Sequence, residues 1–389
     1  MIPLERDEQG WPVWPPQSPE IWESLQQLWA SGQWGKYAAE IHAHCTEAVA
    51  RAMSISNLPS KLPSPWDRDT SRIHATPLTR LCSSGTAAIE LSLRCCGVTE
   101  GDQVAVAAYD YPGNFRTIEL LGATPVLVDV KAGGSTLDPQ SLRQVENARV
   151  KAVVVSHLYG ELADMPAIRE ICDQRNWMLI EDACQVPGAG WELEGDTADA
   201  FLPVGCLSDC ATLSFGGSKL LSAGNGGALL ARNPRVAARL PSYLDRPSDT
   251  FPLSALQCSV LLPQWETLAE FNRRRSRTVT RLREWDWSQF GLSPLASETL
   301  GQRRAYYKFA MQADESQDRP ALLRRLRAAG FPIGEGFRSM HRTSDRRSQK
   351  PVPLPHASEL GKRCVVLDHR ALLADDLIER LDRYVANSP

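Results

Sequence analysis

The sequence predicts an α/β protein whose sheet is largely parallel and covered by helices on both faces. Short apolar runs alternate with helix-period segments from Leu81 to about Arg232. The chain has 389 residues, more than one small core usually holds. Apolar residues make up 43% and charged residues 23%, as in an ordinary folded protein. Strand–helix alternation predicts parallel strands with helical crossovers. Such sheets carry their active sites beyond the carboxyl ends of the strands.

The N-terminal part, residues 1–53, is expected to be a helical segment. Apolar side chains recur at helical spacing over residues 18–29, and a second helical run covers residues 36–52. The tryptophans concentrated here are expected to serve packing more than ligand contact. Residues 54–77 are polar and rich in proline, which indicates a surface loop or insertion.

Residues 54–240 are expected to form the large domain. Its strands are predicted from short apolar runs at residues 104–108, 125–128, 150–155, 177–180, 211–215 and 227–230. Its helices are predicted from longer amphipathic periods at residues 85–96, 113–121, 139–146 and 165–174.

A smaller α+β domain is expected over residues 241–389. A long helical pattern covers residues 253–285 and a strand is predicted near residues 305–311. Two further helices are predicted at residues 320–329 and 375–386.

Charge and cysteine usage exclude several function classes. The formal net charge is −3, which gives no general attraction to nucleic acid or anionic membranes. No apolar stretch reaches the roughly 18 residues that a membrane span needs. The ten cysteines have no disulfide-framework spacing, and Cys206 and Cys210 lack further ligands for a metal. A cytoplasmic protein with reduced thiols and without a metal site is expected.

A basic run interrupts the long helical pattern of the C-terminal domain. Arg273, Arg274, Arg275 and Arg277 are expected to lie on a solvated helix face, with a nucleotide diphosphate contact as the alternative. No aromatic interleaving accompanies the charges, so nucleic-acid binding is not supported.

Three segments at predicted strand ends carry side chains suited to chemistry. Ser84, Gly85 and Thr86 open a helix, where exposed N–H groups and the helix dipole suit a phosphate, or where they only cap the helix. Asp182 directly follows an apolar run, and a carboxylate there can keep a ring nitrogen protonated or act as a surface acid. Lys219 stands alone in a glycine-lined, uncharged stretch, which fits a Schiff-base lysine or a turn lysine.

In this order the segments resemble the DegT/DnrJ/EryC1/StrS sugar aminotransferases, a family of fold-type-I pyridoxal-phosphate enzymes. The resemblance runs from about Trp14 to about Arg275. It rests on the ordered motifs at residues 31–34, 84–88, 121–126 with 128–130, 157–160 with 163–165, 181–185 with 188–189, and 214–215 with 219 and 224–227.

The resemblance implies the following site. Lys219 would bind pyridoxal 5'-phosphate covalently and then move a proton, and Asp182 would pair with the ring nitrogen. The other implied cofactor contacts are Ser84, Gly85, Thr86 and Ser214 at the phosphate, Gln185 at the phenolic oxygen and Tyr111 on the ring face. Trp34, His157 and His341 are expected near the substrate, with a supporting hydrogen bond as the role of His157. A homodimer with shared active sites is also implied.

The sequence departs from the family pattern on the substrate side. Thr250 and Pro252 stand where the family usually has Asn and Arg, which puts a contact between subunits in doubt. The C-terminal His-Tyr motif is absent, and only His341 resembles its later histidine.

The function expected from the resemblance is transfer of an amino group, with glutamate as the common donor, to a keto sugar or keto-cyclitol. The keto sugar is often nucleotide-linked, and the reaction belongs to sugar or secondary-metabolite biosynthesis. Two alternatives are a pyridoxal-phosphate-dependent elimination or dehydration and a cofactor-binding regulator without turnover. Lys219 argues against relatives that dehydrate sugars, since those carry histidine in its place.

Overall fold

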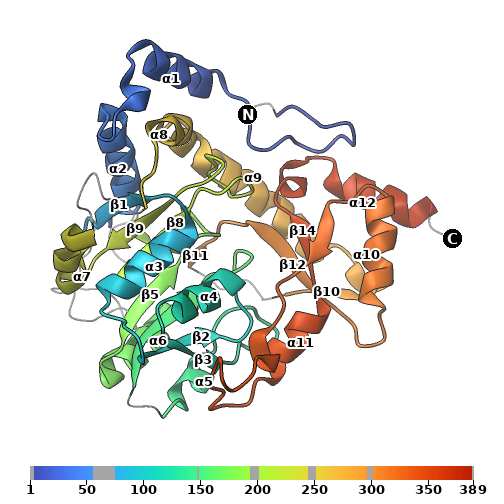
Figure 1. Ribbon diagram of the computed structural model, residues 1–389. Helices are drawn as coiled ribbons and strands as arrows, with labels where there is room; N and C mark the ends of the chain where they lie inside the picture. Colours follow the sequence, from blue (N-terminus) through green and yellow to red (C-terminus); the bar gives the residue numbers. More distant parts are fainter. Residues whose placement is uncertain are drawn as a thin grey trace.

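The computed structural model describes residues 4–55, 75–146, 149–192, 201–243, 251–295 and 301–387. A seven-stranded sheet forms its centre, in the order β1-β9-β8-β5-β4-β2-β3 (Figure 1). The strands are β1 (Leu78–Cys82), β2 (Gln103–Ala107), β3 (Thr124–Val128), β4 (Val150–Ser156), β5 (Met178–Asp182), β8 (Cys210–Ser214) and β9 (Gly227–Ala231). Only β9 runs against its neighbours, so the predicted α/β fold with a mostly parallel sheet is confirmed.

The helices between these strands begin where the sequence supplies start signals. They are α3 (Gly85–Cys95), α4 (Pro112–Leu120), α5 (Pro139–Arg143), α6 (Met165–Arg175) and α7 (Pro234–Arg239). Proline occupies the first turn of α4, α5, α6 and α7. Its fixed φ suits the start of a helix, and the N–H that it lacks would have no partner within the helix there. Asp138, Asp164 and Asn233 cap three of them through side-chain oxygens.

A second, four-stranded antiparallel sheet organises the C-terminal part, in the order β10-β12-β14-β13. Its strands are β10 (Leu292–Pro294), β12 (Lys308–Ala313), β13 (Ile333–Glu335) and β14 (Cys364–Asp368), with helices α10 (Arg319–Ala328), α11 (Pro355–Arg363) and α12 (Leu377–Asn387). A small third sheet joins β6 (Gly190–Glu192), β7 (Phe201–Pro203) and β11 (Gln302–Arg303). The apolar cores of the large and C-terminal sheets are separate, and Trp11 from the N-terminus packs into the second one.

The N-terminal segment forms α1 (Pro19–Ala30), a short 3-10 turn (Gln33–Gly35) and α2 (Glu40–Ala52), close to the predicted helices. These elements lie beside α8 at the top of Figure 1. The proposed loop at residues 54–77 falls mostly outside the described residues. The domain boundaries near residues 53 and 240 stay a prediction.

The single helix predicted over residues 253–285 is wrong. The structure has two helices, α8 (Ala255–Leu261) and α9 (Gln264–Glu284), divided at Pro263. Proline lacks the N–H that a continuous helix needs, and its ring collides with the carbonyl four residues earlier. No helix of the described residues is long and apolar enough to cross a membrane.

Candidate active site

A cavity of about 380 Å³ opens where β1, β5 and β8 end. The eight residues that the sequence assigns to the cofactor all line it: Ser84, Gly85, Thr86, Tyr111, Asp182, Gln185, Ser214 and Lys219. Asp182 and Ser214 are the last residues of β5 and β8, and Ser84 joins β1 to α3. Because β9 is antiparallel to both β1 and β8, these two strands run in the same direction and end at the same edge.

The N-terminus of α3 forms one corner of the cavity. The Ser84 hydroxyl caps the helix by accepting a hydrogen bond from the Ala87 N–H at 3.0 Å. A Cβ on Gly85 would lie only 2.8 Å from the Ser214 Cβ, so glycine allows the end of β8 to approach the helix. The corner therefore combines helix N–H groups with the hydroxyls of Thr86 and Ser214, a donor set that suits a phosphate.

Asp182 is held by hydrogen bonds to both of its carboxyl oxygens. Asn114 Nδ2 donates to Oδ2 at 2.9 Å, and the Cys184 N–H donates to Oδ1 at 3.0 Å. Its side chain is only 6% exposed. These bonds fix the carboxylate at the strand end, where it can accept a further N–H from a ring.

Asp110 lies behind Asp182 and was not identified from the sequence. It is fully buried, and burial, together with the nearby charge of Asp182, raises its pKa to about 7. Ser156 donates to Asp110 Oδ2 at 2.9 Å. Asp110 follows the end of β2, so the reasoning that identified Asp182 from its strand end applies to it as well.

Lys219 is positioned by contacts along its length. Its N–H donates to the Gly216 carbonyl at 2.9 Å, and its carbonyl accepts from Trp14 Nε1 at 2.8 Å. Its Nζ lies 4.5 Å from the centre of the Tyr307 ring. Tyr307 and Lys308, both from the C-terminal part, also line the cavity and were not anticipated. Tyr307 directly precedes β12, and Lys308 is its first residue. The sequence around this strand has no motif that indicates an active site.

His157 lines the floor of the cavity but is itself fully buried. Its Nδ1 accepts from the Ala163 N–H at 3.0 Å, so Nε2 carries the proton and donates to Glu181 Oε1 at 2.8 Å. Both ring nitrogens are thereby engaged by the protein. The arrangement agrees with a supporting hydrogen bond and leaves no ring nitrogen for a substrate.

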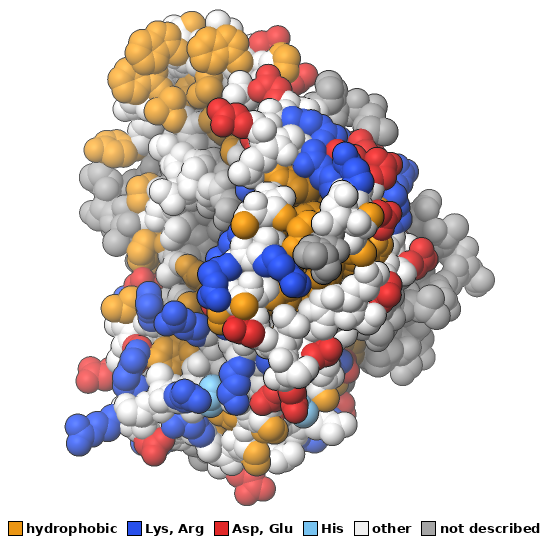
Figure 2. Space-filling model, turned by 90° about the vertical axis from the view of Figure 1, so that its right-hand side faces the viewer, with side chains coloured by type: hydrophobic (Ala, Val, Ile, Leu, Met, Phe, Trp, Pro, Cys, Tyr) orange, Lys and Arg blue, Asp and Glu red, His pale blue; other side chains and the backbone are white. Residues whose placement is uncertain are grey.

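Trp34 and His341 do not line the cavity. Trp34 is 47% exposed and stacks on Trp29, with ring centres 5.5 Å apart. Large hydrophobic side chains are visible at the top of Figure 2, and Trp22 and Trp29 are also largely exposed. These three tryptophans lie outside the described core, and none of them lines the cavity, so their expected packing role stays a prediction. His341 bonds to the Ser339 and Ser358 hydroxyls at 2.9 and 3.2 Å.

The basic run in α9 is only half solvated: Arg273 and Arg277 are exposed as expected, but the expectation is wrong for Arg274 and Arg275. Arg274 is 9% exposed and Arg275 is fully buried. The Arg275 guanidinium lies 4.7 Å from the centre of the Trp14 ring, and its Nη2 is 3.3 Å from His369 Nδ1. Burial lowers the pKa of Arg275 to about 9. A charge run in a sequence does not reveal which of its members face the core.

The segment after residue 250 borders the cavity. The Phe251 carbonyl accepts from the Ser83 N–H at 3.1 Å, and Gln257 Nε2 donates to the carbonyl of Asn225, a lining residue, at 2.8 Å. Pro252 is exposed, while Thr250 lies outside the described residues.

The residues present fit pyridoxal 5'-phosphate. The Gly85 corner offers phosphate donors, Asp182 offers a carboxylate for a ring nitrogen, and Lys219 offers an amine in the same cavity. Tyr111 is 42% exposed and contributes an aromatic ring to the lining. Cys184 lines the cavity too, but burial and the charge of Asp182 raise its pKa well above the usual value, so it is no ready nucleophile.

Comparison with known proteins agrees with this geometry. The model of the DegT/DnrJ/EryC1/StrS aminotransferase family matches residues 79–385. An L-glutamine:2-deoxy-scyllo-inosose aminotransferase of Streptomyces paromomycinus is 27% identical, over 94% of this chain and 91% of that one. The GDP-perosamine synthase of Caulobacter vibrioides is 29% identical over 67% of this chain and 72% of its own length. The crystal structure of 3-amino-5-hydroxybenzoic acid synthase superposes with a TM-score of 0.80 at 25% identity, covering 99% of this chain and 100% of that one.

A family model that covers most of the chain, together with relatives that match nearly all of it, identifies the protein class. The chain belongs to the DegT/DnrJ/EryC1/StrS family and is a pyridoxal-phosphate-dependent aminotransferase.

Proposed function

We propose that this aminotransferase moves an amino group from glutamate or glutamine to a keto sugar or keto-cyclitol in amino sugar or secondary-metabolite biosynthesis. The observation that carries the proposal is the convergence of Lys219, Asp182 and the α3 N-terminus on one cavity. Relatives named for a cyclitol and for a sugar product support this class of acceptor.

Each residue has a separate task in this proposal. When bound, the cofactor supplies an electron sink for the negative charge left at the carbon that loses its proton. Lys219 Nζ would hold the cofactor covalently, and as a free amine it would take and return the proton at the substrate carbon. Asp182 keeps the ring nitrogen protonated, and its own bonds to Asn114 and Cys184 prevent it from turning away.

The remaining lining residues would hold and orient the cofactor. Ser84, Gly85, Thr86 and Ser214 would bind the phosphate, and Tyr111 would lie against the ring. Gln185 Oε1 accepts from the Tyr159 N–H at 3.1 Å, which leaves its amide group to donate to the phenolic oxygen. His157 donates a hydrogen bond to Glu181 of β5 and so holds that strand in place, which makes its effect on the substrate indirect.

Two further assignments belong to the proposal. We expect a homodimer in which each subunit completes the other's site; the exposed Trp22, Trp29 and Trp34 are available for such a contact. We expect a cytoplasmic location because the ten cysteines are free and buried, and the Cys96 and Cys210 sulfurs lie 3.8 Å apart without a disulfide.

An absorbance experiment tests the proposed chemistry. The purified protein loaded with pyridoxal phosphate should show the band of a lysine-bound cofactor, and glutamate or glutamine should convert it to the amine form. Lys219→Ala should abolish the band, whereas Lys308→Ala, which removes the other lysine of the cavity, should keep it. A band that does not change when amino donors are added would contradict the transaminase proposal. Loss of the band in Lys308→Ala but not in Lys219→Ala would show that Lys308, and not Lys219, binds the cofactor.

The likeness to 3-amino-5-hydroxybenzoic acid synthase favours one second candidate, formation of an aromatic amine from a cyclic ketone. Lys219 would also carry the cofactor in this second reaction. An aromatic product absorbs in the ultraviolet, so product spectra with cyclic ketone acceptors distinguish the two reactions.

A further inference from the structure

A second carboxyl group lies behind the carboxylate of the cofactor cavity. Asp182 and Asn114 line the cavity, whereas Asp110 does not belong to the lining and is fully buried. Both β2 and β5 run parallel to β4, so Asp110, which follows β2, lies at the same sheet edge as Asp182 at the end of β5. Asp182 has a task in the proposed function, but Asp110 has none.

Two polar side chains connect these carboxyl groups. The Ser156 hydroxyl lies 2.9 Å from Asp110 Oδ2 and 3.4 Å from Asp182 Oδ2. Asn114 Nδ2 donates to Asp182 Oδ2 at 2.9 Å and lies 3.5 Å from Asp110 Oδ2. A charge on Asp110 therefore acts on Asp182 directly and also through two shared hydrogen-bond donors.

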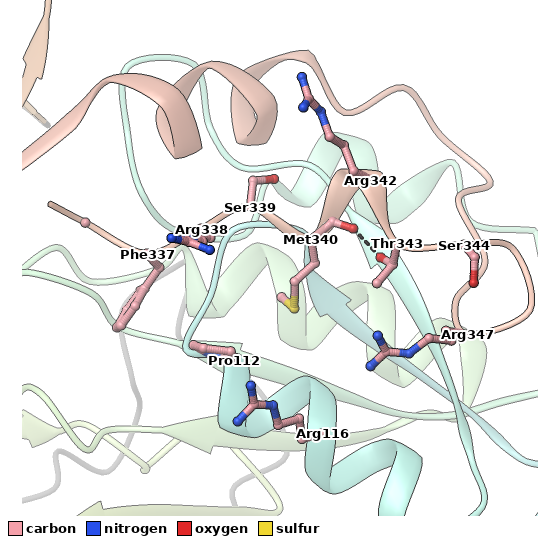
Figure 3. Close-up of a pocket in the computed structure, with 11 residues that line it drawn as sticks. Pro112, Arg116, Phe337, Arg338, Ser339, Met340, Arg342, Thr343, Ser344 and Arg347 are labelled. Atoms are coloured by element: carbon pink, nitrogen blue, oxygen red, sulfur yellow. Dashed lines mark hydrogen bonds between the residues drawn. The ribbon is translucent and has the colours of Figure 1, made fainter. Parts of the chain in front are cut away.

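Asp182 is the charged group that acts most strongly on Asp110 among the described residues. Tyr159 lies near Asp110, but burial raises the pKa of its hydroxyl well above the usual value, so it stays neutral. Both ring nitrogens of His157 are bound to other groups. Arg116 of α4 points into a separate cleft lined by several arginines (Figure 3). The charge next to Asp182 therefore governs how readily Asp110 ionises.

The arrival of the cofactor changes that charge. Burial, and next the charge of Asp182, raise the pKa of Asp110 to about 7, so Asp110 is mostly protonated below this pH in the cofactor-free protein. A protonated ring nitrogen against Asp182 offsets the carboxylate and thereby lowers the pKa of Asp110. Because Asp110 is already fully buried, the cofactor removes no further water from it, and no added desolvation opposes this change.

We propose that Asp110 is a positioning residue for the cofactor ring: it gives up its proton as the ring nitrogen arrives, and its new negative charge strengthens the hold of Asp182 on the ring N–H. The proton passes to the solvent. The Ser156 hydroxyl then donates to the ionised Asp110, while Asn114 continues to donate to Asp182. Asp110 touches no reacting atom and acts only through these neighbours. The inference rests on the proposed position of the ring nitrogen at Asp182.

A count of protons during cofactor binding tests the inference. Calorimetric titration of the cofactor-free protein with pyridoxal phosphate, repeated in buffers of different ionisation enthalpy, gives the number released. At about pH 7 the wild type should release more protons than Asp110→Asn, whereas at about pH 9 the two should release equal numbers, because Asp110 is then ionised beforehand. Asp138→Asn, which replaces the carboxylate that caps α5, should match the wild type.

The cofactor affinity gives a second readout from the same titrations. From about pH 5 to about pH 9 the affinity of the wild type should rise about tenfold relative to that of Asp110→Asn, as for a fall of one pKa unit on binding. Equal proton release by the two proteins at every pH overturns the inference. Ser156→Ala serves where Asp110→Asn does not fold. Because the Ser156 hydroxyl stabilises the ionised Asp110, its loss should move proton release to higher pH, and an unchanged pH of release overturns the inference.

Asp182→Asn separates this inference from the proposed function. If Asp182 holds the ring nitrogen, this variant should bind pyridoxal phosphate at least tenfold more weakly, since a charged hydrogen-bond partner is lost. Weaker binding by Asp182→Asn, with equal proton release by the wild type and Asp110→Asn, leaves the cofactor position standing and removes the role of Asp110. Unchanged binding by Asp182→Asn overturns the cofactor position itself, and the role of Asp110 with it.

Discussion

Asp110 and Asp182 direct their Oδ2 atoms at the same two hydrogen-bond donors. Asn114 Nδ2 lies 3.5 Å from Asp110 Oδ2 and 2.9 Å from Asp182 Oδ2, and the Ser156 hydroxyl lies 2.9 and 3.4 Å from them. Two buried carboxyl groups this close disfavour each other's ionisation. Asp110 therefore stays protonated below about pH 7 and lies as a neutral acid behind Asp182 and the ring nitrogen of the proposed cofactor site.

The raised pKa of Asp110 gives a stability prediction with a definite sign. In the folded protein its pKa is about 7, against about 3.8 for an unperturbed group. The folded state therefore binds this proton more tightly, and the resulting stabilisation is complete below about pH 4 and lost as pH rises to about 7. Asp110→Asn replaces the carboxyl group with an amide, which does not titrate in this pH range. The unfolding temperature of the cofactor-free wild type should fall relative to that of Asp110→Asn between pH 4 and 7.

The measurement is thermal unfolding of both proteins across that range, with Asp138→Asn as a control for loss of an aspartate elsewhere. Parallel pH curves for the wild type and Asp110→Asn would show that the pKa of Asp110 is the same in the folded and unfolded protein, and would contradict a protonated Asp110 behind Asp182.

Gly85 gives a prediction about the phosphate corner. A methyl group at this position would meet the Ser214 Cβ at 2.8 Å and Cys184 Sγ at 3.0 Å, so Gly85→Ala should push β8 away from the helix N-terminus. Affinity for pyridoxal phosphate should fall about tenfold or more, as expected when charge-assisted bonds lose their geometry. Fluorescence titration of the cofactor-free protein measures this. Gly35→Ala, with no atom within 4 Å of the new methyl group, is the matched control.

Sequence reasoning predicted part of the cofactor side from local signals, because Ser84 opens a helix and Asp182 ends a strand. The cofactor roles of Tyr111, Gln185 and Ser214 came only from the family resemblance. Tyr307 and Phe337 reach the cavity from the C-terminal part, and only tertiary packing brings them there. The same limit explains Arg275, whose charge predicts solvent while the fold buries it beneath Trp14.

The buried Arg275 is expected to reduce stability. Its Nε and Nη1 have no hydrogen-bond partner among the described residues, and unpaired buried donors are costly. Arg275→Met keeps the length and the contact with Trp14 but removes the charge. The unfolding temperature should rise by about 1 °C or more, the shift that roughly 1 kcal/mol produces in a chain of this size. Arg273→Met, at an exposed position of the same helix, should change it little. A lower unfolding temperature for Arg275→Met would show that the guanidinium is a net stabiliser.

Trp14 ties the N-terminal segment to Lys219, the proposed catalytic lysine, since its Nε1 donates to the Lys219 carbonyl at 2.8 Å. Trp14→Phe keeps an aromatic ring beside Arg275 and Phe271 but removes this one bond. A hydrogen bond of this kind contributes about 1 kcal/mol, so the glutamate half-reaction should slow about fivefold. Its dependence on glutamate concentration should stay unchanged, because the variant loosens the lysine and not the substrate contacts. Trp11→Phe is the matched control, since Trp11 Nε1 donates at 2.7 Å to the Gly330 carbonyl, away from the cavity. If both variants slow the reaction equally, the effect belongs to the general stability of the N-terminal segment and Trp14 has no particular role in positioning Lys219.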